Sequence, residues 1–311
     1  MKHSDASLEL LSANASRLRY ASDRSALEKV RPVVLLALPA RLEPDDVLQH
    51  TRTLCDVFDA KLFVLRVAST PSPSNRRQGF KTSGGHSPEA VTTETLRWHE
   101  RALGEELARD QVCVYASELK VAVTEVAQAI RPCLVVIPYL DACDGELITR
   151  IVRDTAIAVL AARSTHHGDG IVAATDLSDQ QYPVLRQGLR IACGQVAPIT
   201  FIHNVKPDTV ASRTHRCIRR SLVSLEDIGR ELGAKCARIT ANQTNTVDVI
   251  LTVAETQGAS LIVVGTHLNP RHERDRRRKS VARQVVEQAT RSVMVVPVRG
   301  PGVHAGGARA R

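Results

Sequence analysis

Residues 260–298 read SLIVVGTHLNPRHERDRRRKSVARQVVEQATRSVMVVPV, and the order of residue types in this stretch decides the fold. Its two ends, 260–264 and 293–298, are apolar, β-branched runs, which are typical of strands buried on both faces of a parallel sheet. Between them, Val281, Val285 and Ala289 recur at the spacing of one face of an α-helix. A strand, a helix and a second strand in this order predict a right-handed βαβ unit.

The same kinds of segment recur in the same order in both halves of the chain. The apolar runs are 33–39, 61–67, 112–117, 134–138 and 157–163 in the first half, and 171–177, 198–204, 235–240, 262–266 and 293–299 in the second. Helical stripes between them are Val123, Val126, Ala127 and Ile130; Ile218, Leu222, Leu225 and Leu232; and Val247, Ile250, Leu251 and Ala254. This alternation predicts two tandem doubly wound α/β domains, each with a five-stranded parallel sheet.

The repeat also predicts the domain bounds. We expect an N-terminal extension over 1–30, a first domain over 31–164, a linker over 164–170, a second domain over 168–300 and a flexible basic tail over 301–311. The first strands are offset by 138 residues (172 − 34) and the fourth strands by 128 (262 − 134). The difference predicts about ten extra residues in the first half, within the Pro-, Gly- and Ser-rich segment 69–88.

Composition bounds the class of protein. The chain has 311 residues, of which 43% are hydrophobic and 24% charged, a balance typical of globular proteins. No apolar run is long enough to span a bilayer, and the N-terminus shows no secretory h-region, so we expect a cytoplasmic protein without membrane contact. The seven cysteines form no C-x-x-C pair, and no ligand cluster accompanies His166 and His167. We therefore expect reduced thiols and no metal site.

The charge of the chain favours an anionic partner. The formal net charge is +9 and the pI is about 9.5. The excess is concentrated at 76–77, 213–220, 271–279 and 299–311. The run 271–279 is either a solvated loop or a set of phosphate donors.

Polar residues follow two strands of the second half. Asp176 ends the first strand, Gly265 ends the fourth, and Ser280 precedes a predicted helix over 281–288. Ligands of open parallel sheets bind at the carboxyl ends of the strands, where a glycine admits a phosphate and a capped helix N-terminus favours an anion. Two alternatives stay open: Asp176 caps the next helix together with Ser178, and Gly265 forms a plain tight turn.

The segments VAATDLSD (172–179), FIHNV (201–205), LIVVGTH (261–267) and SVARQVVEQATRSVMVVPV (280–298) resemble the universal stress protein family. The resemblance covers nearly the whole chain, as a tandem two-domain member, and is strongest over 170–299. It implies an adenine nucleotide alpha hydrolase-like, Rossmann-like fold, a role in the stress response, and binding of ATP or another adenine nucleotide. By resemblance, the nucleotide would be contacted by Asp176, Val205, Val264, Gly265, Thr266, Ser280 and Val281.

Two positions depart from the family's phosphate motif, G-x2-G-x9-G-[ST]. Leu268 replaces the second glycine, Lys279 replaces the third, and the loop is one residue longer. A side chain at 268 hinders the approach of backbone to phosphates, whereas the arginines of 271–279 offer charged donors. His203 and His267 match histidines common in the family, although a packed histidine and a surface-loop histidine are the plainer interpretations.

The first half departs further from the motif. Leu38 stands in the place of Asp176, and Ile137-Pro138 stands in the place of Gly265-Thr266. We therefore expect the first domain to be structural and not to bind nucleotide.

Three classes of function follow. The first is a stress-response regulatory protein that binds an adenine nucleotide in the second domain only. The second is a nucleotide-free interaction scaffold, an intramolecular pseudo-dimer through the fifth strands (157–162 and 293–298) with an unknown protein partner or a second copy. The third, ranked last, binds the phosphate backbone of nucleic acid through the arginine-rich loop. No G-x-S-x-G, H-E-x-x-H or G-x4-G-K-[ST] motif occurs, so beyond incidental ATP hydrolysis we do not expect an enzyme.

Overall fold

The computed structural model describes residues 31–39, 45–67, 112–115, 118–139, 145–163, 168–177, 179, 181–204, 222–224, 226–241, 244–268 and 280–299. Several predicted features lie outside these residues: the extension 1–30, the loop 69–88, Ser178, Val205, Ile218, Leu225, the arginine-rich run 271–279 and the tail 301–311.

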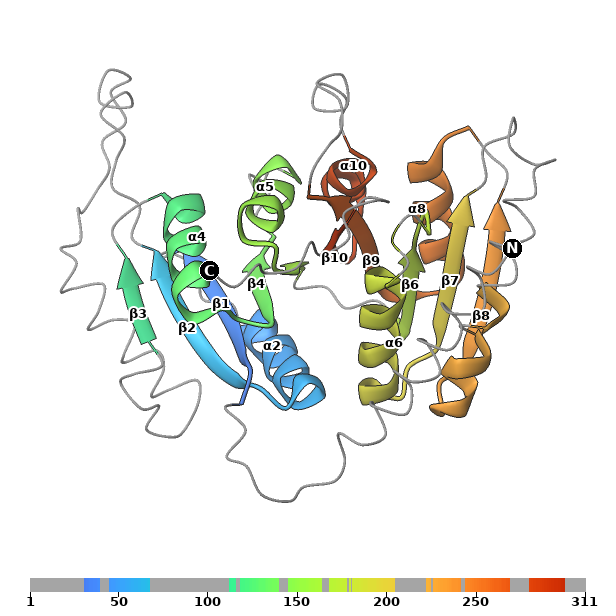
Figure 1. The fold of residues 1–311 in the computed structure, drawn as a ribbon, viewed down its shortest axis with the longest axis horizontal. Coiled ribbons are helices and arrows are strands. Elements are labelled where there is room, and N and C mark those ends of the chain that lie inside the picture. The colour runs from blue at the N-terminus through green and yellow to red at the C-terminus, as the bar shows by residue number, and fades with distance from the viewer. Residues whose placement is uncertain are drawn as a thin grey trace, which may run out of the picture.

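Ten strands of the described chain form one continuous sheet (Figure 1). They are β1 (Val33–Pro39), β2 (Lys61–Val67), β3 (Val112–Tyr115), β4 (Leu134–Pro138), β5 (Val159–Ala162), β6 (Gly170–Ala174), β7 (Ile199–Asn204), β8 (Cys236–Ala241), β9 (Ala259–His267) and β10 (Ser292–Val298). Their order across the sheet is β3-β2-β1-β4-β5-β10-β9-β6-β7-β8, and all pairs within each half are parallel. The predicted doubly wound α/β fold with five parallel strands in each half is confirmed.

The strand register reproduces the repeat that the sequence predicts. Leu36 pairs with Val136 in the first half, and Ala174 pairs with Val264 in the second. These two pairs are related by the predicted offsets of 138 (174 − 36) and 128 (264 − 136) residues. Equivalent strands therefore occupy equivalent places, and the first half repeats the fold of the second.

Helices cover both faces of the sheet. They are α2 (Asp45–Phe58), α4 (Leu119–Ile130), α5 (Gly145–Thr155), α6 (Pro183–Gln195), α8 (Thr246–Thr256) and α10 (Val281–Gln288). On one face, α2 and α6 pack around a core cluster that includes Leu36 and Val263. On the other, α4, α5, α8 and α10 pack around a cluster that includes Val135 and Val264. Neighbouring strand residues thus supply opposite cores, which is why the central strands are apolar at nearly every position.

One predicted helical stripe needs a correction. Helix α10 buries Ala282, Val285 and Val286, and Ala289 after it is also buried, whereas Val281 is 39% exposed. The prediction that Val281 faces the core is wrong. Apolar spacing assigns residues to a face, but it does not tell how far along the helix the packed part extends.

The two halves join through β5 and β10. These strands pair antiparallel, with Val159 opposite Val295, Leu160 opposite Met294 and Ala161 opposite Val293. Because the fifth strands are offset by 136 residues, Val159 pairs with its own equivalent (159 + 136 = 295). The halves are therefore related by a local two-fold axis through this pair, and the predicted contact through the fifth strands is confirmed.

Helices of the two halves also contact each other on both faces of the sheet. Where α5 meets α10, Arg283 donates to the carboxylate of Glu146 over 2.8 Å, and a Cβ at Gly145 would lie 2.5 Å from the carbonyl oxygen of Arg283. Where α2 meets α6, a Cβ at Gly194 would lie 2.8 Å from Val57 Cγ2. Glycine at both positions lets the helices approach closely.

The cores are built mainly from Val, Leu, Ile and Ala, and they enclose thiols. Cys55 is buried, and Cys133, Cys193 and Cys236 are half-buried, all without disulfide partners. Burial, with smaller contributions from neighbouring thiols and carboxylates, raises the pKa of Cys55 to about 12 and that of Cys236 to about 11. These described cysteines agree with the prediction of reduced thiols.

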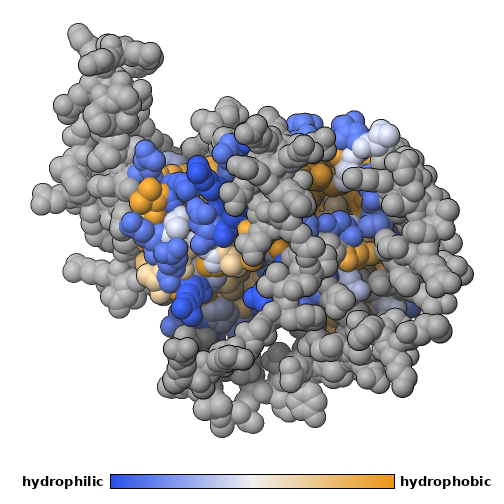
Figure 2. All heavy atoms as spheres, turned by 45° about the horizontal axis from the view of Figure 1, so that its top comes forward, coloured by the Kyte–Doolittle hydropathy of each residue, from blue (hydrophilic) through white to orange (hydrophobic). Residues whose placement is uncertain are grey.

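No helix in the described ranges is long and apolar enough to cross a membrane. Within the same ranges, His, Cys, Asp and Glu side chains do not gather in groups of three that could hold a metal ion. In the view of Figure 2, most of the described surface is hydrophilic, with hydrophobic residues visible in patches between.

Candidate functional site

Two of the predicted site residues meet at one edge of the sheet. Strands β6 and β9 are parallel neighbours, with Ala174 opposite Val264, so the residues that follow Ala174 lie beside the end of β9. There the Oδ2 atom of Asp176 lies 3.1 Å from Nε2 of His267. Both side chains are accessible, at 59% for Asp176 and 42% for His267. The plainer interpretation of His267 as a loop residue is wrong, since it ends β9 and pairs with Asp176.

The backbone after β6 is held in a fixed turn that presents Asp176. The Thr175 hydroxyl accepts a hydrogen bond from Leu177 N at 3.0 Å, and Leu177 has a left-handed φ of 56°. The carbonyl oxygen of Thr175 accepts from Nδ1 of His203 at 2.8 Å. Only 5% of His203 is exposed, so this histidine is a packed, hydrogen-bonded residue that supports the turn. Asp176 does not cap α6, whose N-cap residue is Tyr182.

A second carboxylate fixes the other side of this loop. Asp179 accepts from the backbone N–H of Gln181 at 2.9 Å and from that of Arg299 at 2.8 Å. The loop after β6 is therefore tied to the end of β10. Sequence analysis missed this role, because the partners are 120 residues apart and one of them is a backbone group.

Gly265 lies inside β9 and is packed on its α6 side. A Cβ there would lie 2.5 Å from Val298 Cγ2 and 3.0 Å from Val184 Cγ2. Its φ is not left-handed, unlike that of Gly258 or Gly233. The tight-turn interpretation is wrong, and glycine is needed at 265 at least for packing.

Thr266 and Val264 point to the opposite face of β9, toward the layer of α8 and α10. Each is 2% exposed. The Thr266 hydroxyl is buried and has no hydrogen-bond partner among the described residues. A buried hydroxyl without a partner is costly, so an acceptor or donor from a ligand would satisfy it. Val264 contributes to the core itself.

Ser280 caps α10, as its place in the sequence predicts. Its extended backbone and its hydroxyl, which accepts from Arg283 N at 3.2 Å, are those of an N-cap residue. The first turn of the helix leaves further N–H groups without helical partners, which favours an anion at this end. The exposed Val281 stands at the same end. The Arg283 side chain is directed to Glu146 and Glu287 instead.

The position of the second motif glycine is also described. The backbone N–H of Leu268 donates to the carbonyl oxygen of Val298 at 3.1 Å, which extends the pairing of β9 with β10. This N–H is therefore not free for a phosphate. Val205 and the arginine-rich run, predicted to contribute to the site, lie outside the described residues.

The equivalent edge of the first half is apolar. Leu38 and Ile137, which occupy the places of Asp176 and Gly265, are both fully buried, and Pro138 follows as the last residue of β4. This edge therefore lacks the polar groups that Asp176 and His267 supply in the second half, and the absence of nucleotide binding by the first half stays a prediction.

A pocket of about 590 Å³ lies elsewhere, between α6 and the first half, and none of the predicted site residues lines it. The predicted site is therefore an open edge and not this cavity.

Comparison with known proteins identifies the fold. Residues 169–297 match the model of the universal stress protein family. A universal stress protein from Archaeoglobus fulgidus DSM 4304 superposes with a TM-score of 0.60 at 15% identity, covering 85% of this chain and 98% of that chain. A structure from Pseudomonas aeruginosa UCBPP-PA14, provisionally assigned to the same family, gives a TM-score of 0.60 at 13% identity and covers 86% and 94%.

A shorter structure also aligns with part of the chain. It is the universal stress protein from Archaeoglobus fulgidus in complex with dAMP, which covers 43% of this chain and 99% of its own length at 22% identity and a TM-score of 0.33. No curated protein matches this chain.

Proposed function

We propose that this chain, whose residues 169–297 belong to the universal stress protein family, is a stress-response regulatory protein that binds an adenine nucleotide in its second half only. The observation that carries the proposal is the meeting of Asp176 and His267 at the carboxyl edge of β6 and β9. Carboxyl ends of parallel strands are where ligands of this fold class bind.

In the proposed complex, the carboxylate of Asp176 accepts hydrogen bonds from the ribose or the adenine. The phosphates lie at the N-terminus of α10, whose first turn is organised by the Ser280 cap. Thr266 supplies the hydroxyl that is otherwise unsatisfied. Because Leu268 N is already bonded to β10, phosphate binding needs donors other than those of the family's glycine loop.

The pairing of Asp176 with His267 has a consequence for this proposal. The nucleotide must either accept His267 as a further donor or displace it from Asp176. Both side chains are accessible enough to rearrange without disturbing the core.

A matched pair of substitutions tests the site. Asp176→Asn removes one negative charge at the proposed site. As the control, Asp59→Asn removes one negative charge from an exposed side chain that precedes β2 in the first half. We expect AMP or ATP at millimolar concentration to raise the melting temperature of the wild type and of Asp59→Asn, but not that of Asp176→Asn. An equal rise in both variants, or no rise in any protein, would refute the assignment.

We propose binding without turnover, and cytoplasmic action, as the sequence leads us to expect. Incubation of ATP with the purified protein checks the first point. Release of ADP at a constant rate over many equivalents would contradict it.

A nucleotide-free interaction scaffold is the second candidate. It is favoured by the intramolecular partners that Asp176, Ser280 and Leu268 N already have. On this alternative, Asp176→Asn leaves the affinity for a protein partner unchanged. Gly265→Asp is not a useful test, because its side chain would collide with Val298 whatever the function.

A further inference from the structure

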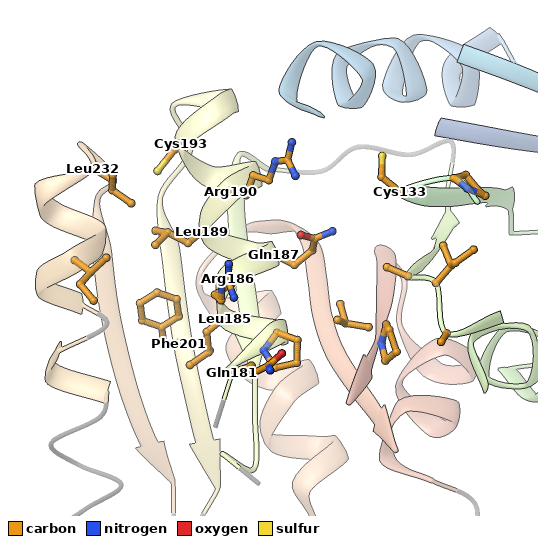
Figure 3. Close-up of a pocket in the computed structure, with 18 residues that line it drawn as sticks. Cys133, Gln181, Leu185, Arg186, Gln187, Leu189, Arg190, Cys193, Phe201 and Leu232 are labelled. Carbon is orange, nitrogen blue, oxygen red and sulfur yellow. The ribbon is translucent and has the colours of Figure 1, made fainter. Parts of the chain in front are cut away.

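The pocket between the halves combines residues from both repeats (Figure 3). The first half contributes Pro132 and Cys133, which precede β4, and residues 156–158, which precede β5. The second half contributes one side of α6, the end of β10 at Val296 and Pro297, and three residues packed beside α6, namely Phe201, Ile228 and Leu232. The volume of about 590 Å³ lies within the range of small-molecule sites.

Most of the lining is apolar. Leu185 and Leu189 of α6 and Phe201 of β7 are less than 10% exposed and line one side, where Figure 3 shows them grouped together. Ile228 and Leu232 continue this side, and both are partly buried against the same core. Because Leu185, Leu189 and Phe201 are already almost fully buried, the apolar surface that a ligand can still remove from water is that of partly exposed residues such as Ile228 and Leu232.

The polar part of the lining is cationic. Among the described lining residues it consists of Gln181, Gln187, Arg186 and Arg190, and none of these described residues is an aspartate or a glutamate. Arg190 contacts the first half at Phe58. Its guanidinium donates to the carbonyl oxygen of Phe58 at 3.2 Å and lies over the Phe58 ring, 4.4 Å from the ring centroid. Its partial burial lowers the pKa of the guanidinium. Arg186 is exposed; its backbone N–H donates to the carbonyl oxygen of Tyr182, but its guanidinium makes no hydrogen bond or ion pair with a described residue.

The repeat shows that Arg186 is specific to one half. Helices α2 and α6 end at Phe58 and Gln195, an offset of 137 residues (195 − 58), and the hydrogen bonds that close the two helices have the same offset. The equivalent of Arg186 in α2 is therefore Gln49 (186 − 137), which is exposed. The second half places a guanidinium in the lining of the pocket, where the first half carries a neutral amide at the equivalent helical position.

We propose that this pocket binds a small amphiphilic anion, whose apolar body lies against Ile228 and Leu232 and whose carboxylate or phosphate monoester is held by Arg186. A guanidinium forms charge-assisted, bidentate hydrogen bonds with both groups. The ligand contacts residues of both halves, so its binding stabilises their junction. This pocket borders the nucleotide edge, since its lining residues Val296 and Pro297 pair with Gly265 and Thr266, but it shares no residue with the predicted nucleotide site, and the proposal does not depend on the function proposed above.

Calorimetric titration with decanoate, decyl phosphate and uncharged decanol tests the proposal on the full chain. We expect one equivalent of decanoate or decyl phosphate to bind, and decanol to bind at least tenfold more weakly, about the effect of losing one charge-assisted hydrogen bond. The ratio between the two anions shows which head group is preferred. Equal binding of decanol and decanoate would overturn the role of Arg186, and absence of binding by either anion would overturn the site.

Two leucine substitutions locate the binding. Arg186→Leu removes the guanidinium from the pocket, and Arg150→Leu removes an exposed charge from α5 on the opposite face of the sheet. We expect Arg186→Leu to weaken decanoate binding about tenfold, Arg186→Lys to restore part of it, and Arg150→Leu to leave it unchanged. Unchanged affinity in Arg186→Leu, or equal loss in both leucine variants, would contradict the proposal. The comparison of decanoate with decanol on the wild type holds even if a variant fails to fold.

Discussion

Replacing Gly265 with alanine separates a packing role from a ligand role at the predicted phosphate edge. The new Cβ would lie 2.5 Å from Val298 Cγ2 and 3.0 Å from Val184 Cγ2. Both valines are buried, at 5% and 2% exposure, and a β-branched side chain has few alternative rotamers. The contact must therefore be relieved by movement of β9, β10 or α6.

The magnitude follows from two opposing effects. Overpacking of a core costs about 1–3 kcal/mol. A Gly to Ala change also restricts the unfolded chain, which stabilises the fold by about 0.4–1 kcal/mol. We expect Gly265→Ala to lower the free energy of unfolding by a net value of about 0.5–2 kcal/mol in the absence of any nucleotide.

Urea unfolding followed by circular dichroism measures this change, with an unchanged m-value as the sign that the unfolded state is unaffected. Val298→Ala removes the nearest methyl groups, so the double variant should recover part of the loss, with a coupling of about 1 kcal/mol. An alanine at 265 that leaves stability unchanged, or effects that simply add, would refute the packing argument.

Three further predictions concern a cap, the junction and the thiols. Ser280→Ala should lower the free energy of unfolding by about 1 kcal/mol, because the Ser280 hydroxyl accepts from Arg283 N, whereas Ser280→Asp should keep most of the wild-type stability. Urea unfolding measures both changes. Glu146→Gln and Arg283→Gln should each lower the free energy of unfolding by less than about 1 kcal/mol, because their ion pair is partly exposed. Because the two side chains contact each other, their effects should couple in a double-mutant cycle, and purely additive effects would contradict the contact. Burial raises the pKa of Cys55 to about 12 and that of Cys236 to about 11, so the stability that these protonated thiols contribute should be complete below pH 9 and be lost as the pH rises towards 12, because the unfolded thiols lose their protons first. Cys55→Ala should flatten this dependence in urea unfolding measured as a function of pH.

The fold class was predictable from the sequence because most strands are apolar along most of their length and the segments recur in the same order in both halves. The pairs of Leu36 with Val136 and of Ala174 with Val264 reproduce the offsets of the repeat. Short βαβ connections leave few topologies for such a pattern. The junction at Val159 and Val295 follows from the same repeat, since equivalent edge strands can pair about a two-fold axis.

The details of the site were less predictable, because they depend on contacts between distant segments. The sequence places Asp176 and Gly265 at strand ends, but the pairing of Asp176 with His267 spans 91 residues. A glycine in a motif suggests a backbone that approaches phosphate, whereas the valines on the α6 side of Gly265 come from α6 and β10. The domain bounds, Val205 and the arginine-rich run stay predictions.

Mass spectrometry of small molecules released from the denatured, purified protein tests the central claim most directly. The account predicts an adenine nucleotide in the wild type and in Asp59→Asn, and none in Asp176→Asn. Wild-type protein that releases no nucleotide and gains no thermal stability from added AMP or ATP would contradict nucleotide binding by the second half and would favour the interaction scaffold.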